Sequence, residues 1–264
     1  AEAVATSDRN CFSAANGRIG MVKIAGLASN RGRNLLHIAD RAPGGAELSI
    51  VLTNEDGAPV LEGAAERGIP TEVVTREEDE SRESHEQRIV ETLEGYDFDI
   101  VCLDGYMRIL TDEFLDSAPT TLNVHPALLP AFPGMDAHEQ VLDAGVRMTG
   151  CTVHVVTEEV DAGPIVTQEA VPVYECDTVD DLKQRVLSEG EFTAYPRAVR
   201  WFAEDRVSVD HEAETTAIDG DTGGDFPQRR LVDDDLADTL RYGENPHQEA
   251  AVYADGTCEE ANVV

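Results

Sequence analysis

Lysine is almost absent from this sequence of 264 residues, since Lys23 and Lys183 are the only lysines among its 20 basic residues. Against these stand 53 aspartates and glutamates, which give a formal net charge of −33. So negative a chain repels other polyanions, which argues against a nucleic-acid partner and against an anionic membrane surface. The excess of carboxylates also destabilises a compact fold unless salt screens it. We therefore expect a halophilic protein.

Cysteine is scarce, and long apolar runs are missing. The five cysteines are scattered, with no Cys-x-x-Cys pair, so we expect reduced thiols in a cytoplasmic protein and no structural metal. No apolar run reaches the length that spans a bilayer. Residues 1–20 lack the apolar centre of a signal peptide, and we expect them to form a flexible extension.

From Met21 onward, short runs of β-forming residues alternate with helical patterns. The expected strands cover 21–28, 48–53, 71–75, 98–103 and 120–125, and the expected helices cover 34–39, 60–67, 81–93 and 112–117. This rhythm predicts an α/β fold with a Rossmann-like, mostly parallel sheet and helices on both faces. A ligand of such a sheet lies beyond the carboxyl ends of its strands.

The rhythm changes after Asp136. We expect a helix over 138–143, two strands over 148–156 and 164–174 that pair as a hairpin, and a long helix over 178–203. Residues 205–227 are acidic and rich in Gly, Thr and Asp, a composition typical of a solvated linker. The chain is therefore divided into an extension (1–20), a main domain (21–211), an acidic linker (212–228) and a last segment (229–264).

Asn123 and His125 stand two apart at the end of an apolar run and directly before Pro126. Residues i and i+2 of a strand share a face, so the amide and the imidazole point the same way. Proline ends the strand because it cannot donate to the ladder. A hydrogen-bond donor beside a titratable ring suits a developing oxyanion. The motif is short, and a strand end whose polar residues only cap a turn stays open as the alternative.

Residues 29–34, Ser-Asn-Arg-Gly-Arg-Asn, join the first expected strand to the first helix. Gly32 permits a tight turn, and the helix start offers unpaired N–H groups at the positive end of its dipole. Arg31 and Arg33 add positive charge in an acidic chain. A phosphate cradle and an ordinary turn explain this loop equally well, but it is not a P-loop because the Gly-Lys-Ser/Thr ending is missing.

Further polar side chains fall in or beside loops. Asp161 lies between two expected strands, where it could deliver a carboxylate to a cleft or simply form a turn. His154 is either part of a site or a satisfied core histidine. The loop over 105–110 follows a buried strand and suits a ligand-lining role. Arg82 begins a helix, from which its guanidinium could meet a carboxylate or lie in water.

The combination of these motifs is more specific than any one of them. The loop at 29–34, Asn-x-His-Pro-x-Leu-Leu-Pro at 123–130, Thr-x-His at 152–154 and Asp-x-Gly-Pro at 161–164 follow one another in this order. Together they resemble the folate-dependent formyltransferases, in particular those that act on glycinamide ribonucleotide (GAR), over about residues 21–211. The resemblance implies a Rossmann-like fold, N10-formyltetrahydrofolate as co-substrate, no metal, and a monomer or homodimer acting on small molecules.

The resemblance also implies a role for individual residues. The implied catalytic residues are Asn123, His125 and Asp161, with His154 supporting them; those for the substrate are Gly32, Arg33, Asn34 and Glu191; those for the folate are Arg82, Met107, Arg108 and Leu110. Two departures affect the substrate side. The loop at 29–34 has one glycine fewer and two arginines more than the family's Ser-Gly-Asn-Gly-Ser-Asn, and Phe192 replaces a usual histidine.

The last segment carries a second resemblance. Residues 240–253 resemble the opening of an AICAR transformylase domain, in which Arg241 and Tyr242 match positions that contact the nucleotide. That family's Lys-His catalytic segment is missing. We therefore expect residues 229–264 to be the truncated start of such a domain, without a second activity.

Transfer of a formyl group to the amine of GAR is the predicted function, and two alternatives compete with it. A formyltetrahydrofolate deformylase uses the same three catalytic residues with water as acceptor, but usually carries an N-terminal regulatory domain and has less need of a phosphate loop. A non-catalytic nucleotide- or folate-binding module would not need the intact trio. A methionyl-tRNA formyltransferase is disfavoured because its RNA substrate calls for a basic surface.

Overall fold

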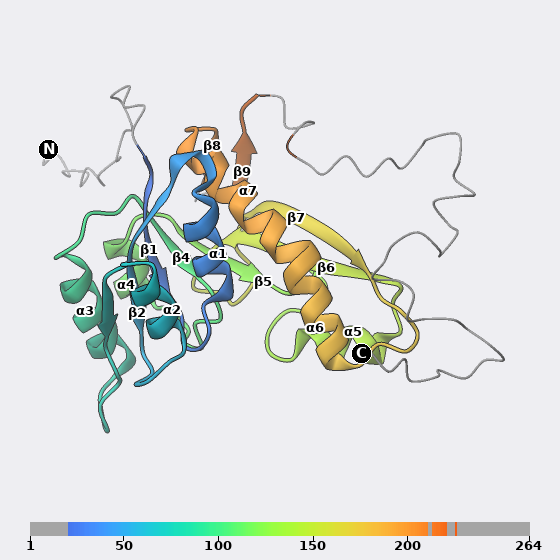
Figure 1. Ribbon diagram of the computed structural model, residues 1–264, viewed down its shortest axis with the longest axis horizontal. Helices are drawn as coiled ribbons and strands as arrows, with labels where there is room; N and C mark the ends of the chain where they lie inside the picture. Colours follow the sequence, from blue (N-terminus) through green and yellow to red (C-terminus); the bar gives the residue numbers. More distant parts are fainter. Residues whose placement is uncertain (1–20, 211–212, 221–224, 226–264) are drawn as a thin grey trace, which may run out of the picture.

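The computed structural model describes residues 21–210, 213–220 and 225. The predicted extension over 1–20 and the predicted AICAR transformylase-like segment over 229–264 lie outside these residues. The main sheet has seven strands in the order β3-β2-β1-β4-β5-β6-β7 (Figure 1). The strands are β1 (Lys23–Leu27), β2 (Glu47–Thr53), β3 (Thr71–Val73), β4 (Ile100–Leu103), β5 (Thr121–His125), β6 (Met148–Val155) and β7 (Ile165–Pro172). The pairs among β1 to β5 are parallel and β6 is antiparallel to both its neighbours, which confirms the predicted α/β fold and the predicted hairpin.

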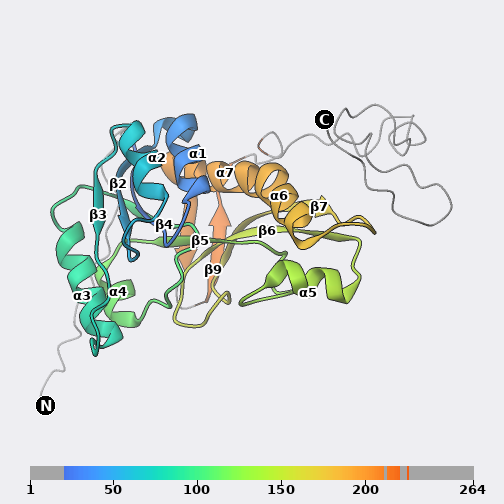
Figure 2. The same ribbon diagram turned by 60° about the horizontal axis from the view of Figure 1, so that its bottom comes forward.

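Helices cover the sheet on both faces, as Figure 2 shows. They are α1 (Arg33–Arg41), α2 (Val60–Glu66), α3 (Arg82–Leu93), α4 (Asp112–Ser117), α5 (Ala137–Ala144), α6 (Val179–Arg185) and α7 (Phe192–Ala203), with a 3-10 turn (Pro43–Gly45) and a π-helical turn (Val186–Glu191). Each face has its own apolar core. In β2, Val51 faces the core shared with α1, α2 and α7, whereas Ile50 and Leu52 face the core shared with α3 and α4. Strands buried on both faces read as the continuous apolar runs seen in the sequence.

Two segments differ from the sequence expectations. The long helix expected over 178–203 is divided into α6, the π-helical turn and α7, and at the turn Gly190 packs closely on Cys151, where an added Cβ would lie 3.3 Å from Sγ. The linker expected over 212–228 is wrong at β9 (Thr215–Ile218), which pairs with β8 (Val207–Asp210). Thr216 Oγ1 donates to the carbonyl of Ile165 at 2.5 Å, so this hairpin is fixed to β7.

The structure also tests two expectations drawn from composition, namely that the cysteines are reduced and that no segment spans a membrane. Cys102 and Cys151 are buried and free, but Cys176 is disulfide-bonded, so the expectation of reduced cysteines is wrong at that position. Among residues 21–210, 213–220 and 225, none of the helices combines the length and the apolar character needed to cross a bilayer.

Candidate active site

A cavity of about 950 Å³ opens where the chain leaves β1 and β4. The strand order reverses between these two strands, because β1 is followed along the sheet by β2 on one side and β4 on the other. Such a switch point separates the loops and leaves a crevice. The cavity extends along β5, which outruns β4: Leu103, the last residue of β4, pairs with Asn123, and His125 lies two residues further on. The polar pair at 123 and 125 therefore lines the cavity.

His125 is held by acceptors at both ring nitrogens. Its Nε2 lies 2.7 Å from the carbonyl oxygen of Phe132, which can only accept, so Nε2 carries the proton. Its Nδ1 lies 3.1 Å from Asp161 Oδ2. The imidazole is 4% exposed, so the carboxylate acts on it with little screening by water. A doubly protonated ring satisfies both contacts at once.

His154 connects the other two members of the predicted trio. Its Nδ1 faces the carbonyl of Val155 at 3.0 Å, and its Nε2 lies 3.2 Å from Asn123 Nδ2 and 3.6 Å from Asp161 Oδ1. In the neutral ring Nε2 accepts an N–H of Asn123, and in the charged ring it donates to Asp161 instead. The first contact fixes which way the amide of Asn123 points and leaves its second N–H for a ligand.

Asp161 sits in a strained conformation, with φ +56° in the left-handed region. Non-glycine residues adopt such a φ at some energetic cost, and often at functional sites. Burial raises the pKa of its carboxyl, but the nearby ring of His154, the N–H of Gly134, which donates at 2.7 Å, and the charge of His125 outweigh burial and hold that pKa below its usual value. The carboxylate is therefore ionised at neutral pH and able to balance an imidazolium.

The loop after β1 turns at Gly32, whose φ is +54°. The turn presses this residue against α2, because a Cβ built on it would lie only 2.4 Å from Val60 Cγ2. Both facts restrict position 32 to glycine. The chain then enters α1 with the exposed side chains of Arg31 and Arg33 on either side of the turn.

Replacing Gly32 with alanine is expected to lower the free energy of unfolding by about 2 kcal/mol, since the backbone strain and the clash with Val60 add together. Chemical denaturation measures the loss. Gly57→Ala is the matched control, because Gly57 has φ +71° with nothing within 4 Å of the added Cβ, and it isolates the backbone strain. Measured against Val60→Ala alone, the double variant Gly32→Ala/Val60→Ala should show a smaller loss, because it removes the contact at 2.4 Å and leaves only the Cβ of residue 60 at 3.1 Å. An equal loss at positions 32 and 57 would contradict the packing argument.

Two half-buried carboxyl groups, those of Asp104 and Glu191, meet the side chain of Asn34 at one end of the cavity. Its Nδ2 donates to Glu191 Oε2 at 2.6 Å and to Asp104 Oδ1 at 3.0 Å. Burial raises the pKa of Glu191 to about 7, and the nearby charge of Asp104 adds to this effect. Burial also raises the pKa of Asp104, although the bonds from Asn34 oppose the shift. The sequence interpretation missed Asp104. Its position directly after a buried strand is the signal that could have revealed it.

The raised pKa of Glu191 predicts a pH-dependent loss of stability. Below about pH 4.5 the group is protonated in both the folded and unfolded states, whereas between pH 4.5 and about 7 only the folded state keeps the proton. Ionisation thus favours unfolding as the pH rises. Relative to Glu191→Gln, the unfolding free energy of the unsubstituted protein should fall by about 2 kcal/mol across this range. Glu189→Gln, at an exposed position of the same turn, is the control, and parallel pH profiles for Glu191→Gln and the unsubstituted protein would contradict the prediction.

The residues predicted to line a folate site are only partly brought together. Met107, Arg108 and Leu110 line the cavity, and the N–H of Met107 donates to Ser29 Oγ at 2.7 Å, which ties this loop to the one after β1. Arg82 is exposed at the start of α3 and does not line the cavity, so its role stays a prediction. The sequence interpretation also missed Lys183, which lines the cavity from α6.

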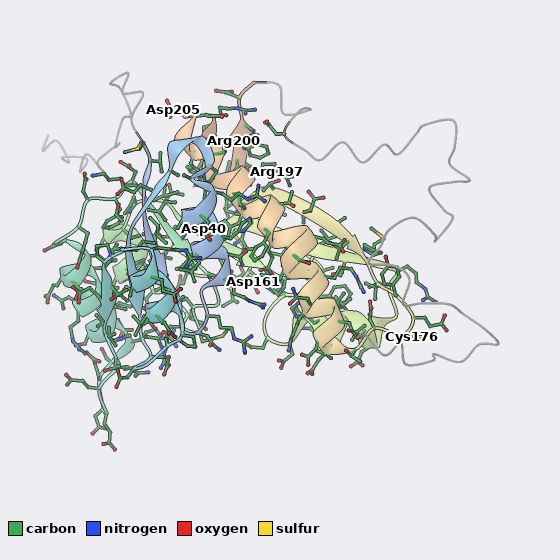
Figure 3. The ribbon with its side chains drawn as sticks, in the orientation of Figure 1. Asp40, Asp161, Cys176, Arg197, Arg200 and Asp205 are labelled. Carbon is green, nitrogen blue, oxygen red and sulfur yellow. The ribbon has the colours of Figure 1, made fainter. Side chains whose placement is uncertain are left out.

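The site is built from elements that are distant in the sequence. Asp161 comes from the loop between β6 and β7, whereas the Arg197 and Arg200 labelled with it in Figure 3 lie along α7, away from the cavity. The cavity joins Asn123, His125 and Asp161 to the loop at 31–34 and to Glu191. Within the described ranges, no group of three or more His, Cys, Asp or Glu side chains is arranged to hold a metal ion.

Comparisons with known proteins agree with this geometry. Residues 22–199 match the family model described as formyl transferase. The chain is 44% identical over 191 residues to the trifunctional purine biosynthetic protein adenosine-3 of Bos taurus, covering 71% of this chain and 19% of that protein. It is 36% identical over 196 residues to the phosphoribosylglycinamide formyltransferase of Escherichia coli, covering 73% of this chain and 92% of that one. The chain thus spans about a fifth of the length of the trifunctional relatives.

Solved structures give the same picture. The glycinamide ribonucleotide transformylase 1 of Symbiobacterium toebii is 41% identical with a TM-score of 0.71, covering 75% of this chain and 94% of that chain. The phosphoribosylglycinamide formyltransferase of Anaplasma phagocytophilum is 37% identical with a TM-score of 0.70, covering 76% of this chain and 96% of that chain.

Proposed function

The chain belongs to the formyl transferase family, and we propose that it transfers a formyl group from N10-formyltetrahydrofolate to the amine of GAR in purine biosynthesis. The observation that carries the proposal is the convergence of Asn123, His125 and Asp161 on one cavity that also reaches the loop at 31–34. The names of the relatives support the same substrate, including the Escherichia coli enzyme that the chain matches over 92% of its length.

The residues present fit both substrates. The exposed apolar side chains of Met107 and Ile109 line the cavity and offer a surface for the flat ring system of a folate. Glu191 and Asn34, at the other end, can bond hydroxyl groups of a ribose. N10-formyltetrahydrofolate supplies the formyl carbon, which the amine of GAR attacks, so that a C–N bond forms to the amine and the bond to N10 breaks.

The charges of the site explain how the chain assists this transfer. Negative charge grows on the formyl oxygen as the amine attacks. Asn123 donates its free amide N–H to that oxygen, and the protonated ring of His125 stabilises the charge from the same strand face. Asp161 keeps the ring charged. It also accepts a proton from the amine, directly or through water, and this proton then passes to the departing N10.

Formyl transfer from a labelled formyl donor tests the proposal against both alternatives. We expect labelled formyl-GAR when GAR is present and little release of formate when it is absent. Rapid release of labelled formate without GAR would identify a deformylase. Binding of either ligand without any transfer would identify a non-catalytic module.

We also propose that the protein is adapted to high salt, on the basis of its charge of −33. That it is cytoplasmic is likewise proposed, from its few, scattered cysteines. Raising KCl from about 0.1 M to 3 M shortens the screening length to a few ångströms and should raise the melting temperature by on the order of 10 °C. A melting curve at each salt concentration measures this. Sucrose, which favours burial without screening charge, is the control, and a melting temperature that does not rise with KCl would refute the adaptation.

Two predictions about the rest of the chain stand as proposals. The division at residues 211 and 228 rests on composition, with β9 as its known exception. The resemblance of residues 229–264 to the start of an AICAR transformylase domain is likewise proposed from sequence motifs alone.

A further inference from the structure

The N-terminus of α1 is capped by a side chain from a distant part of the chain, the residue that follows β4. Gly32, at the N-cap, has no side chain to accept from the helix. Asp104, directly after β4, replaces it: its Oδ2 accepts from the N–H of Asn34 at 2.7 Å and from that of Leu35 at 3.4 Å. These are the second and third N–H groups of the helix, which an N-cap side chain normally satisfies.

The same N–H groups are those with which a helix N-terminus would hold a phosphate. Here a carboxylate is already bonded to them, and its other oxygen accepts from Asn34 Nδ2 at 3.0 Å. Displacing Asp104 would break several charge-assisted hydrogen bonds. The displaced carboxylate would remain beside Glu191, whose Oε2 accepts from the same Asn34 Nδ2 at 2.6 Å. The incoming phosphate dianion would repel both carboxyl groups.

Two cations stand where a phosphate could reach them without displacing Asp104. Arg31 and Arg33 line the cavity on either side of Gly32. In the described part of this acidic chain, most arginines of the helices that lie outside the cavity, such as Arg88 and Arg185, are paired with carboxylates. Neither Arg31 nor Arg33 forms an ion pair with a described residue. A guanidinium binds phosphate oxygens with two parallel N–H groups, so this pair offers a strong alternative site.

We propose that Asp104 moves phosphate recognition from the helix to side chains, so that the phosphate monoester of the acceptor substrate is held by Arg31 and Arg33 and not by the N–H groups of Asn34 and Leu35. This inference rests on the proposed function, because it concerns the phosphate of GAR. It gives the two arginines by which the loop departs from the family pattern a specific task.

Steady-state kinetics of Arg31→Gln and Arg33→Gln at one fixed ionic strength test the first half of the proposal. Each change should raise the KM for GAR by about 10- to 100-fold, the effect of losing a charged hydrogen bond. The KM for the formyl donor and kcat should change by less than about threefold. Arg147→Gln removes an exposed positive charge outside the cavity and should leave all three parameters unchanged. Unchanged KM values for GAR in both cavity variants would overturn the proposal.

The double variants with Asp104→Ala test the second half. Removing the carboxylate frees the two N–H groups for the phosphate, so the loss of either arginine should now raise the KM for GAR by less than about threefold. An arginine effect of undiminished size in this background would overturn the proposal, because Asp104 would then be a cap without influence on the substrate. Asp104→Asn, which keeps an acceptor but not the charge, should give an intermediate effect, and it replaces Asp104→Ala if circular dichroism shows that the alanine variant is unfolded.

The failure of this inference can be told from failure of the proposed function. If the unsubstituted protein does not transfer a formyl group to GAR, the function is wrong. If it does, but the arginine variants keep its KM for GAR, the function stands and the phosphate assignment is wrong.

Discussion

Replacing Asn123 with alanine is expected to lower kcat by about 10²- to 10³-fold, the usual effect of removing one oxyanion donor. The second N–H of this amide is free because the first is engaged by His154 Nε2 at 3.2 Å. The donor therefore meets the formyl oxygen without having to reorient, and its contribution is larger in the transition state than in the bound ground state. Turnover under saturating substrates measures the loss.

The kinetic pattern separates this role from a structural one. A lost oxyanion donor lowers kcat while the KM for GAR should change little, because the proposed phosphate site at Arg31 and Arg33 does not involve Asn123. An unchanged unfolding free energy would show that the fold is intact. Near-normal turnover in a folded Asn123→Ala variant would break the assignment of the catalytic trio.

Replacing Asp161 with asparagine is expected to lower kcat by about 10³-fold, since a neutral amide cannot balance a charged imidazole. In the unsubstituted protein the carboxylate lies 3.1 Å from His125 Nδ1 and accepts from the N–H of Gly134. The substitution keeps the size of the group and removes its charge. The pKa of Asp161 lies below its usual value, which keeps the carboxylate ionised over the whole neutral range.

A pH profile of kcat distinguishes this electrostatic role from positioning alone. In the unsubstituted protein kcat should fall at acidic pH as the carboxyl of Asp161, whose pKa lies below its usual value, takes up a proton. This acidic loss should be absent from the already slow Asp161→Asn variant. Asp143→Asn makes the same isosteric change at an exposed position of α5 and serves as the control. If Asp161→Asn retained more than a tenth of the turnover, Asp161 would not be the group that charges the ring.

The sheet and the pair at 123 and 125 could be predicted because their signals are local. Alternation along a strand places Asn123 and His125 on one face, and a proline fixes where the strand ends. The contacts of Asp161 could not be derived in this way, since they depend on how a loop 36 residues away folds back over β5. The catalytic role of Asp161 was predicted from the family resemblance, because no periodic pattern in the sequence indicates it.

The two local misses have physical causes. Asp104 has a task only because the N-terminus of α1 is brought against the end of β4, and its N-cap partner is a glycine that gives no capping signal. The acidic, Gly-rich composition around β9 indicated a linker, but the short run Thr-Thr-Ala-Ile at 215–218 pairs with β8. Tertiary pairing overrode local composition there.

The overhang of β5 beyond β4 divides the site into a fixed part and an exchangeable part. Asn123 and His125 belong to the backbone ladder with β6, whereas the groups proposed to meet the acceptor come from separate connections after β1, β4 and α6. Changes in those connections can alter which nucleophile is admitted without moving the groups proposed to stabilise the formyl oxygen. An architecture of this kind gives evolution, or an engineer, a way to redirect one chemistry from an amine to water by rebuilding loops alone.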